Sequence, residues 1–353
     1  MTGTAKVKSG SKAGKVQYPY DAMVYIDGTV VYAVDKEGNV IRRGVAGTDD
    51  SAVVQAAINS LSAYGHCILR GSFTFNSSVL IYSSNVTIDL GGSYIYKTVA
   101  PDPIFVVGDG ITTVLGVKIT NGRLQGPLSA TITEGLKING AKNCEFHSLY
   151  IDGFNVGLSV DGGAGGTWYN FFSNLIVARA RDSCIKIEKT GVGNCNSSFF
   201  SNCVINGSVI TGLNVTTGNL HTFTNCNIEG STVHDISVTG NASVAMLGGR
   251  IEHSTGDVYV DATGVLEIVG SHEKDRALTF GGTRANVFTY PIEGQIKATK
   301  ITVGATNCNY TTIAAALQYI VSYGAASESN QYLIEVYGSF TERWRLSELW
   351  QNM

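Results

Sequence analysis

Charged residues, prolines and paired cysteines are all scarce in this sequence. Asp, Glu, Lys and Arg make up 15% of the 353 residues, against about a quarter in an average globular domain. The net charge of −3 provides no basic field of the kind that nucleic-acid binding requires. The 5 prolines beside 42 glycines fit neither a disordered chain nor a collagen. The composition therefore predicts a globular protein rich in strands and turns, with no nucleic-acid partner.

Long apolar runs are missing as well. No stretch approaches the roughly 18 apolar residues that a membrane span needs, so we expect no membrane insertion. Residues 1–17 carry four lysines, but no apolar segment follows them, as it would in a secretory signal. We interpret this segment as a flexible basic tail. We expect the protein on a virion or an extracellular surface, reached without a secretory signal peptide.

The cysteines are odd in number and form no Cys-x-x-Cys pair. This pattern argues against a disulfide framework and against a zinc site. Buried free thiols are the simpler prediction, and we expect neither a metal nor a cofactor. The seven residues are Cys67, Cys144, Cys184, Cys195, Cys203, Cys226 and Cys308.

A repeat of 22 to 28 residues organises the middle of the chain. One series of short alternating strands begins at residues 135, 157, 184, 212, 235 and 257, and a second series ends at residues 151, 177, 205, 228 and 251. Two strand series that advance in phase do not come from a helical repeat, so each unit is predicted to be one coil of a parallel β-solenoid. Asn174, Asn202 and Asn225 share one position of the coil, and Cys203 and Cys226 share another, as stacked ladders should.

An amphipathic helix is predicted before the first coils, over residues 47–61. Thr48 is the natural N-cap, the apolar side chains fall on one face, and Gly65 follows the end of the helix. Because a solenoid must cover the open end of its core, we expect this helix to plug the N-terminal end of the stack.

The segment 47–92 contains Gly-Thr-Asp-Asp, an Ala-Ala-Ile-Asn helix, a Gly-x-x-x-x-Arg-Gly-Ser-Phe turn and the run Ser84-Asn85-Val86-Thr87-Ile88. It resembles the opening of the pectate-lyase-like right-handed β-helix proteins, which include polysaccharide lyases, glycosidases and viral tailspikes. The resemblance covers about residues 47–275. It implies an all-β fold: a right-handed single-stranded parallel β-helix with an N-terminal cap helix, a small N-terminal β module and a C-terminal helix–strand module.

Four regions are expected along the chain. After the basic tail at 1–17, residues 18–46 read as a β-meander that serves as a head or neck, and residues 47–290 contain the cap helix and the parallel β-helix. Residues 291–353 form a C-terminal α/β module, with a helix-like run at 310–321 and a strand at 332–337. The module serves as an end plug or a joint to a partner chain, unless the chain is truncated.

Two adjacent coils carry longer loops, at residues 161–171 and 188–199. Asp161 and Glu188 are expected to point outward at the loop bases, with Lys186 two residues earlier, and Trp168 and Tyr169 lie within the first loop. Aromatic faces and carboxylates are what glycans require, so the loops predict a glycan-binding cleft. In the alternative, the two aromatic side chains fold down over the coils.

A second candidate site comes from strand alternation. If Ile228 and Ile251 point inward, then Glu229 and Glu252 point outward from neighbouring coils. Adjacent carboxylates repel, so the pKa of one is expected to rise, which would provide the acid and the ionised partner of a glycosidase. Arg250 and His253 adjoin them as glycan-binding candidates. The alternative is a pair of carboxylates on a solvated strand face.

Outward Ile176 and Val204 form an apolar stripe, which favours a homotrimer, the assembly that the tailspike resemblance implies; a covering loop is the alternative. The leading hypothesis is a virion or cell-surface attachment protein that binds envelope glycan through the side of the β-helix. Other virion or assembly proteins would then bind the terminal modules. A polysaccharide depolymerase, hydrolase rather than lyase, and a structural stalk or filament subunit are the alternatives.

Overall fold

The computed structural model describes residues 19–97, 103–127, 134–252 and 256–270, and beyond these only the backbone of five short strands. The expected basic tail at 1–17 and the helix-like run at 310–321 lie outside the described residues. The five strands are β31 (His272–Glu273), β32 (Phe280–Gly282), β33 (Val287–Tyr290), β34 (Thr299–Val303) and β35 (Tyr332–Val336).

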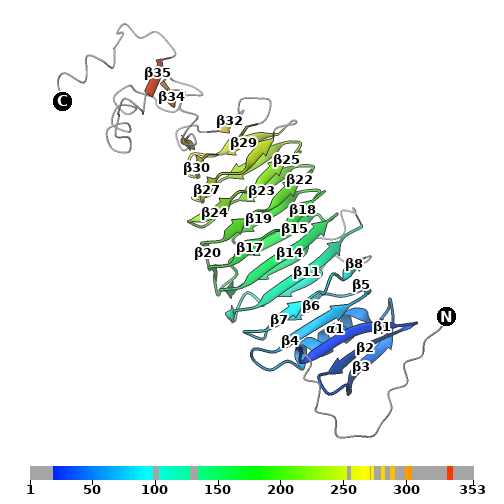
Figure 1. The fold of residues 1–353 in the computed structure, drawn as a ribbon. Helices are drawn as coiled ribbons and strands as arrows, with labels where there is room; N and C mark the ends of the chain where they lie inside the picture. The colour runs from blue at the N-terminus through cyan, green and yellow to red at the C-terminus, as the bar shows by residue number, and fades with distance from the viewer. Residues whose placement is uncertain are drawn as a thin grey trace.

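Successive coils stack their strands in three parallel sheets, which confirms the predicted β-solenoid; it makes about seven turns (Figure 1). The second sheet, with nine strands, consists of β6 (Val79–Ile81), β9 (Phe105–Val107), β12 (Glu134–Asn139), β15 (Val156–Asp161), β19 (Ser183–Glu188), β23 (Thr211–Val215), β26 (His234–Val238), β29 (Asp257–Val260) and β32. The narrow sheet consists of β10 (Val114–Leu115), β13 (Ala141–Lys142), β16 (Thr167–Trp168) and β20 (Cys195–Asn196).

The large sheet receives strands from every coil and from the N-terminal meander. Its first coil strands are β4 (His66–Arg70), β5 (Ser72–Phe75), β7 (Thr87–Asp89), β8 (Tyr94–Lys97), β11 (Lys118–Gln125) and β14 (Glu145–Asp152). Its later strands are β17 (Phe171–Ser173), β18 (Ile176–Ala178), β21 (Phe199–Ser201), β22 (Val204–Asn206), β24 (His221–Thr224), β25 (Asn227–Glu229), β27 (Ser243–Leu247), β28 (Arg250–Glu252), β30 (Val265–Val269), β31 and β33.

A left-handed residue bends the large sheet once in each coil. Asn174, Asn202 and Asn225 adopt φ values of +53°, +52° and +51°, so the predicted asparagine ladder is a ladder of bends. Asparagine and glycine adopt this backbone conformation at low cost. The backbone N–H of each asparagine donates to a carbonyl of the next coil, at 2.9–3.0 Å. Each bend is therefore held by the coil stacked beside it.

The core is a column of inward side chains. Phe146, Phe172, Phe200 and Phe223 stack face to face along the axis, with ring centroids 4.3–5.2 Å apart. The six cysteines within the described ranges are buried and free, as predicted. Repeating the same side chain at the same register thus builds one continuous core.

The N-terminal meander shares a sheet with the first coil. Its strands β1 (Ala22–Asp27), β2 (Val30–Asp35) and β3 (Val40–Val45) pair antiparallel, and β1 also pairs in parallel with β4. At the same end of the stack lies α1 (Asp50–Asn59) (Figure 1). Its buried Val53, Val54, Ala57 and Ile58 belong to the core. The large sheet thus runs from the meander into the solenoid without a break.

The start of α1 differs from the prediction. Asp49, and not Thr48, occupies the N-cap position. The Asp49 carboxylate accepts a hydrogen bond from the backbone N–H of Val45 at 2.8 Å, and the Asp50 carboxylate accepts one from Gly47 at 2.9 Å. Both carboxylates therefore hold the turn that leads into the helix. Within the described part of the chain, no helix has the length and apolarity that a membrane crossing requires.

Candidate functional site

The two long loops pack against each other. Their middle residues form β16 and β20 of the narrow sheet, and backbone N–H groups of Gly162 and Gly193 donate to carbonyls of Glu188 and Gly163 at 3.1 and 2.7 Å. The approach is so close that a Cβ on Gly163 would lie 2.7 Å from the Cα of Gly110 in the preceding loop. The loops therefore form a stacked layer on one side of the coils.

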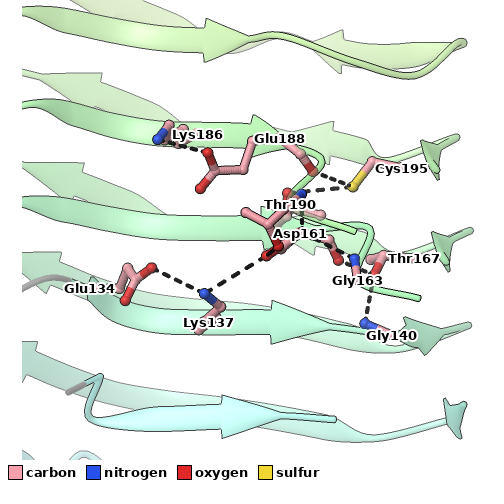
Figure 2. A network of polar contacts seen from close by, with 11 residues as sticks. Glu134, Lys137, Gly140, Asp161, Gly163, Thr167, Lys186, Glu188, Thr190 and Cys195 are labelled. Carbon is pink, nitrogen blue, oxygen red and sulfur yellow. Dashed lines mark hydrogen bonds and ion pairs between the residues drawn. The ribbon is translucent and has the colours of Figure 1, made fainter. Parts of the chain in front are cut away.

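Asp161 ties this layer together: it lies on the outward face of its strand, with Lys137 Nζ 3.8 Å from its Oδ2, but the loops cover it. It pairs with Glu188 in the expected register, but it is 1% exposed. Its carboxylate accepts hydrogen bonds from the backbone N–H of Gly163 and Thr190, each at 3.0 Å, and from the Thr190 hydroxyl at 2.5 Å (Figure 2). Burial raises the pKa of Asp161, but these bonds and the nearby Lys137 outweigh it, so the pKa lies below its usual range. The carboxylate therefore binds N–H groups of both loops, and the loop layer buries it.

Lys186 and Glu188 form an ion pair at 2.7 Å on the second sheet, as Figure 2 shows. Both side chains are half-buried. Burial lowers the pKa of Lys186. The hydrogen bond to the Glu188 carboxylate and the negative charge of that carboxylate outweigh this effect, so the pKa lies above its ordinary value. Lys137 is likewise paired, with Glu134 at 3.4 Å. These lysines are thus neutralised within the protein.

Trp168 and Tyr169 take different positions. The Trp168 indole N–H donates to the carbonyl of Asn194 at 3.0 Å, and the Lys142 ammonium lies 3.9 Å from the ring centroid, so Trp168 folds against its neighbouring coils. Tyr169 is 53% exposed and adopts φ +57°. Trp168 therefore folds over the coils, as in the alternative prediction, whereas Tyr169 remains open to solvent.

A polar pocket of about 440 Å³ opens beside Trp168. The Trp168 indole binds Asn194, and Trp168 pairs with Asn196 on the neighbouring strand; both asparagines line the pocket. Its lining comes from three successive coils: Lys189, Asn194, Asn196, Thr216, Thr217, Gly218, Asn219, Gly240 and Asn241. Amides and hydroxyls dominate this lining, and they can both donate to and accept from sugar hydroxyls. The volume lies within the range of small-molecule sites.

The walls of the pocket are fixed by the coils beneath. The Asn196 side chain accepts a hydrogen bond from the Asn219 N–H at 2.9 Å. Gly218, at φ +87°, would place a Cβ 1.5 Å from the Cys195 carbonyl oxygen, so only glycine fits there. Below it, fully buried His221 lies with Nε2 3.1 Å from the Thr217 carbonyl oxygen. The pocket is therefore built on packed backbone.

The sequence interpretation missed the pocket lining beyond the loop. One signal was available: Asn196, Asn219 and Asn241 are 23 and 22 residues apart, in step with the coils. Such spacing places three amides side by side along the axis. Strand alternation gives no sign of them, because Asn196 ends the two-residue strand β20 and Asn219 and Asn241 lie in turns.

Glu229 and Glu252 are direct neighbours on β25 and β28, as the alternation predicts, and both are half-buried. Glu229 accepts a hydrogen bond from the Asn206 amide at 3.0 Å, and Glu252 forms an ion pair with Arg250. His253 lies outside the described residues. This pair is on the large sheet, and neither carboxylate lines the polar pocket.

The apolar stripe is wider than predicted. Ile176 and Val204 are neighbours between Tyr150 and Asn227 in the expected register, and Ile176 is 39% exposed. On the same two coils, Phe171 is 48% exposed and stacks on Phe199 with ring centroids 5.2 Å apart. The large sheet thus presents two apolar pairs on these coils, one on each side of the bend at Asn174 and Asn202.

Comparison with known proteins supports the fold. No protein-family model matches the sequence, and no curated protein matches it. Among solved structures, ORF18 of Geobacillus virus E2 is similar, with a TM-score of 0.52 and 16% identity, covering 74% of this chain and 66% of that one. The enzymatically active domain of tailspike protein 4 of bacteriophage CBA120 has a TM-score of 0.49 and 14% identity, covering 74% and 44%.

The gp42 tailspike of Acinetobacter phage vb_AbaP_AS12 has a TM-score of 0.49 and 12% identity, covering 81% of this chain and 60% of that one. The chain spans less than two thirds of the length of each of these three proteins. At such identities, the likeness concerns the fold alone. By its coils and by this likeness, the chain has the fold of a parallel β-helix.

Proposed function

We propose that this chain is a virion or cell-surface attachment protein, tailspike-like, that binds envelope glycan through the side of its β-helix. The observation that carries this proposal is the polar pocket beside Trp168, with its amides and hydroxyls from three coils. Coils stack about 4.8 Å apart, so Asn196, Asn219 and Asn241 present similar groups at regular intervals along an extended sugar chain.

The loop residues have distinct roles in this proposal. Tyr169 offers its exposed ring to the apolar face of a sugar, and Trp168 holds the lining residue Asn194 through its indole N–H. Asp161 is a positioning residue that holds the loops, and the Lys186–Glu188 pair contributes polar groups on the adjoining second sheet. Glycan that runs on toward the large sheet would meet Arg250, and His253 remains a glycan-binding candidate by sequence alone.

The apolar stripe of Phe171, Ile176, Phe199 and Val204 is proposed as the contact between three copies of the chain. Its four side chains lie on two adjacent coils, and burying them against the same stripe of a second copy would remove apolar surface from water. The terminal modules would then join the trimer to other virion or assembly proteins.

Replacing Tyr169 by asparagine tests the glycan site. Asparagine tolerates the left-handed backbone at this position, so Tyr169→Asn is expected to fold at least as well as the wild type. Loss of one aromatic contact of about 1–2 kcal/mol corresponds to a five- to thirtyfold weaker affinity. Retention on a panel of immobilised envelope polysaccharides, followed by titration with the retained glycan, measures it.

Tyr64→Asn is the matched control. Tyr64 is also exposed and left-handed, at 82% and φ +66°, but it precedes the first coil strand and is remote from the pocket. This variant should bind like the wild type. Equal affinity of the Tyr169 and Tyr64 variants would remove Tyr169 from the site, and retention of no glycan at all would favour the stalk.

A depolymerase is the second candidate, favoured by the register of Glu229 and Glu252 on adjacent strands. If these carboxylates act as acid and base or nucleophile, the double variant Glu229→Gln, Glu252→Gln should lower product release at least a hundredfold and leave glycan retention intact. Mass spectrometry of soluble products reads out the reaction, and Glu267→Gln, on another strand of the large sheet, is the control. Turnover that survives in the double variant would exclude this pair.

A further inference from the structure

A second group of polar and aromatic side chains lies on the large sheet, away from the pocket. Tyr94, Arg123 and Tyr150 are direct neighbours on β8, β11 and β14. The guanidinium carbon of Arg123 lies 4.4 Å from the ring centroid of Tyr150 and 5.4 Å from that of Tyr94. In Figure 1, β8 and β18 lie at the right edge of the stack and β20, which carries pocket residues, at the left edge.

Asp152 is the centre of this group. It is 0% exposed, and its carboxylate binds two guanidinium groups. Arg179 pairs with both oxygens, with Nε at 2.7 Å from Oδ1 and Nη2 on Oδ2, and Arg123 approaches with Nη2 at 3.3 Å. The two arginine side chains remain 53% and 43% exposed. One buried negative charge thus holds two surface positive charges in fixed places.

This arrangement leaves an excess of one positive charge. Among the described residues, no other carboxylate forms an ion pair with Arg123 or Arg179, and the Arg123 Nε is buried without a hydrogen-bond partner. Two guanidinium groups on one carboxylate repel each other. An anion between their exposed edges would relieve this repulsion and accept charge-assisted hydrogen bonds.

The backbone of Arg179 points to the same conclusion. It adopts φ +50°, directly after β18. The corresponding positions after β14, β22 and β25 are Gly153, Gly207 and Gly230, with φ values of +71° to +79°, and each of the first two donates its N–H to the adjacent coil as Arg179 does. A non-glycine residue is strained in this region of backbone conformation. The coil therefore bears strain at a turn where its neighbours use glycine.

We propose that the Tyr94–Arg123–Tyr150–Asp152–Arg179 cluster is a binding site for a sugar unit that bears a carboxylate. The planar fork of a guanidinium matches a carboxylate in two-point contact. The Arg123 guanidinium lies over both tyrosine rings, and tyrosine hydroxyls are hydrogen-bond partners for sugar hydroxyls. The site extends the proposed glycan binding to a second face, and it takes acidic sugars where the pocket takes hydroxyl-rich ones.

The test uses purified oligogalacturonate and its carboxyl-reduced, neutral counterpart in calorimetric titrations of the full chain. The wild type should bind the acidic form at least tenfold more tightly, and the difference should shrink as salt is raised. Arg179→Gly and Arg123→Gln should each lower affinity for the acidic form about 10- to 100-fold. Arg179→Gly relieves the backbone strain but removes one partner of Asp152. Arg123→Gln leaves the Arg179–Asp152 pair in place, so it decides the question if the first variant unfolds.

Lys118→Gln is the matched control. Lys118 lies on the same strand, is 39% exposed and pairs with Glu145 at 2.9 Å, so its removal changes the charge of the same face by the same amount. The affinity of the Lys118→Gln variant for oligogalacturonate should equal that of the wild type. Equal binding of acidic and neutral sugars, unchanged binding by Arg123→Gln, or an equal loss in Lys118→Gln would each overturn the proposal.

Two further measurements distinguish this site from a general anion site and from the polar pocket. Inorganic phosphate that displaces the oligosaccharide at equal molar concentration would show a general anion site, and would overturn the assignment to a sugar. Arg123→Gln should lower oligogalacturonate affinity by the same factor whether or not the pocket retains a glycan of the panel. The cluster can therefore be confirmed when the pocket retains no glycan, and it can fail when the pocket binds.

Discussion

Replacing Phe200 by alanine is expected to lower the free energy of unfolding by about 3–5 kcal/mol. Phe200 is 1% exposed, and its ring centroid lies 4.3 Å from those of both Phe172 and Phe223. Removing the ring leaves a cavity inside the column. The neighbouring strands are paired in register on both sides, so they cannot close in to fill it. Urea denaturation followed by circular dichroism measures the loss.

Phe171→Ala is the matched control for this change. It removes the same ring from the outward stack with Phe199, where Phe171 is 48% exposed, and the expected cost in a single chain, outside the proposed contact between copies, is about 0.5 kcal/mol. Similar losses in the two variants would contradict the view that the inner column carries the stability of these coils.

The second large effect is a loss of stability in acid that depends on His221. Burial lowers the pKa of His221 to about 4, from an ordinary 6.5. Between these two pH values, the unfolded chain carries a proton on this imidazole and the folded chain does not. The contribution of His221 is therefore fully present above pH 6.5 and is lost as the pH falls to 4, by about 3 kcal/mol.

Melting temperatures at pH 7.5 and 4.5 test this expectation. His221→Gln should reduce the difference between the two pH values, because glutamine does not titrate. His147→Gln changes a half-buried histidine on the outward side of β14 and should keep the wild-type difference. If His221→Gln loses as much stability in acid as the wild type, another group is responsible.

The coils could be predicted because one physical requirement recurs in each of them. The bend of the large sheet needs a left-handed residue, and asparagine meets this need at Asn174, Asn202 and Asn225. Inward positions must stack, so phenylalanine recurs in the column. A requirement that repeats at a fixed interval leaves a pattern in the sequence that does not depend on knowing the structure.

The predictions failed where a side chain serves one turn only. Alternation places Asp161 on the outward face but does not predict its burial. Its carboxylate accepts hydrogen bonds from the N–H groups of Gly163 and Thr190 within the loop layer. The N-cap of α1 is Asp49 instead of the predicted Thr48 for a similar reason, since the Asp49 carboxylate binds the turn before the helix. Such contacts depend on where turns meet in space, and strand periodicity carries no information about that.

The candidate sites fall between these cases. Neighbouring carboxylates on β25 and β28 followed from register alone. The two-guanidinium cluster did not, because Asp152 and Arg179 are 27 residues apart and an arginine in a glycine turn is visible only once the coils are aligned by their backbone bonds. Charge pairing across coils is therefore better read from structure than from sequence.

The direction of the interstrand hydrogen bonds has a mechanical consequence. In the solenoid they join one coil to the next, so they run mainly along the long axis, with the slant of parallel strands. A force that pulls the two ends apart acts in full on every coil interface, because the interfaces lie in series. The interface with the weakest set of bonds therefore breaks first. A force that pushes along the axis presses the coils together. Such a rod withstands thrust far better than tension.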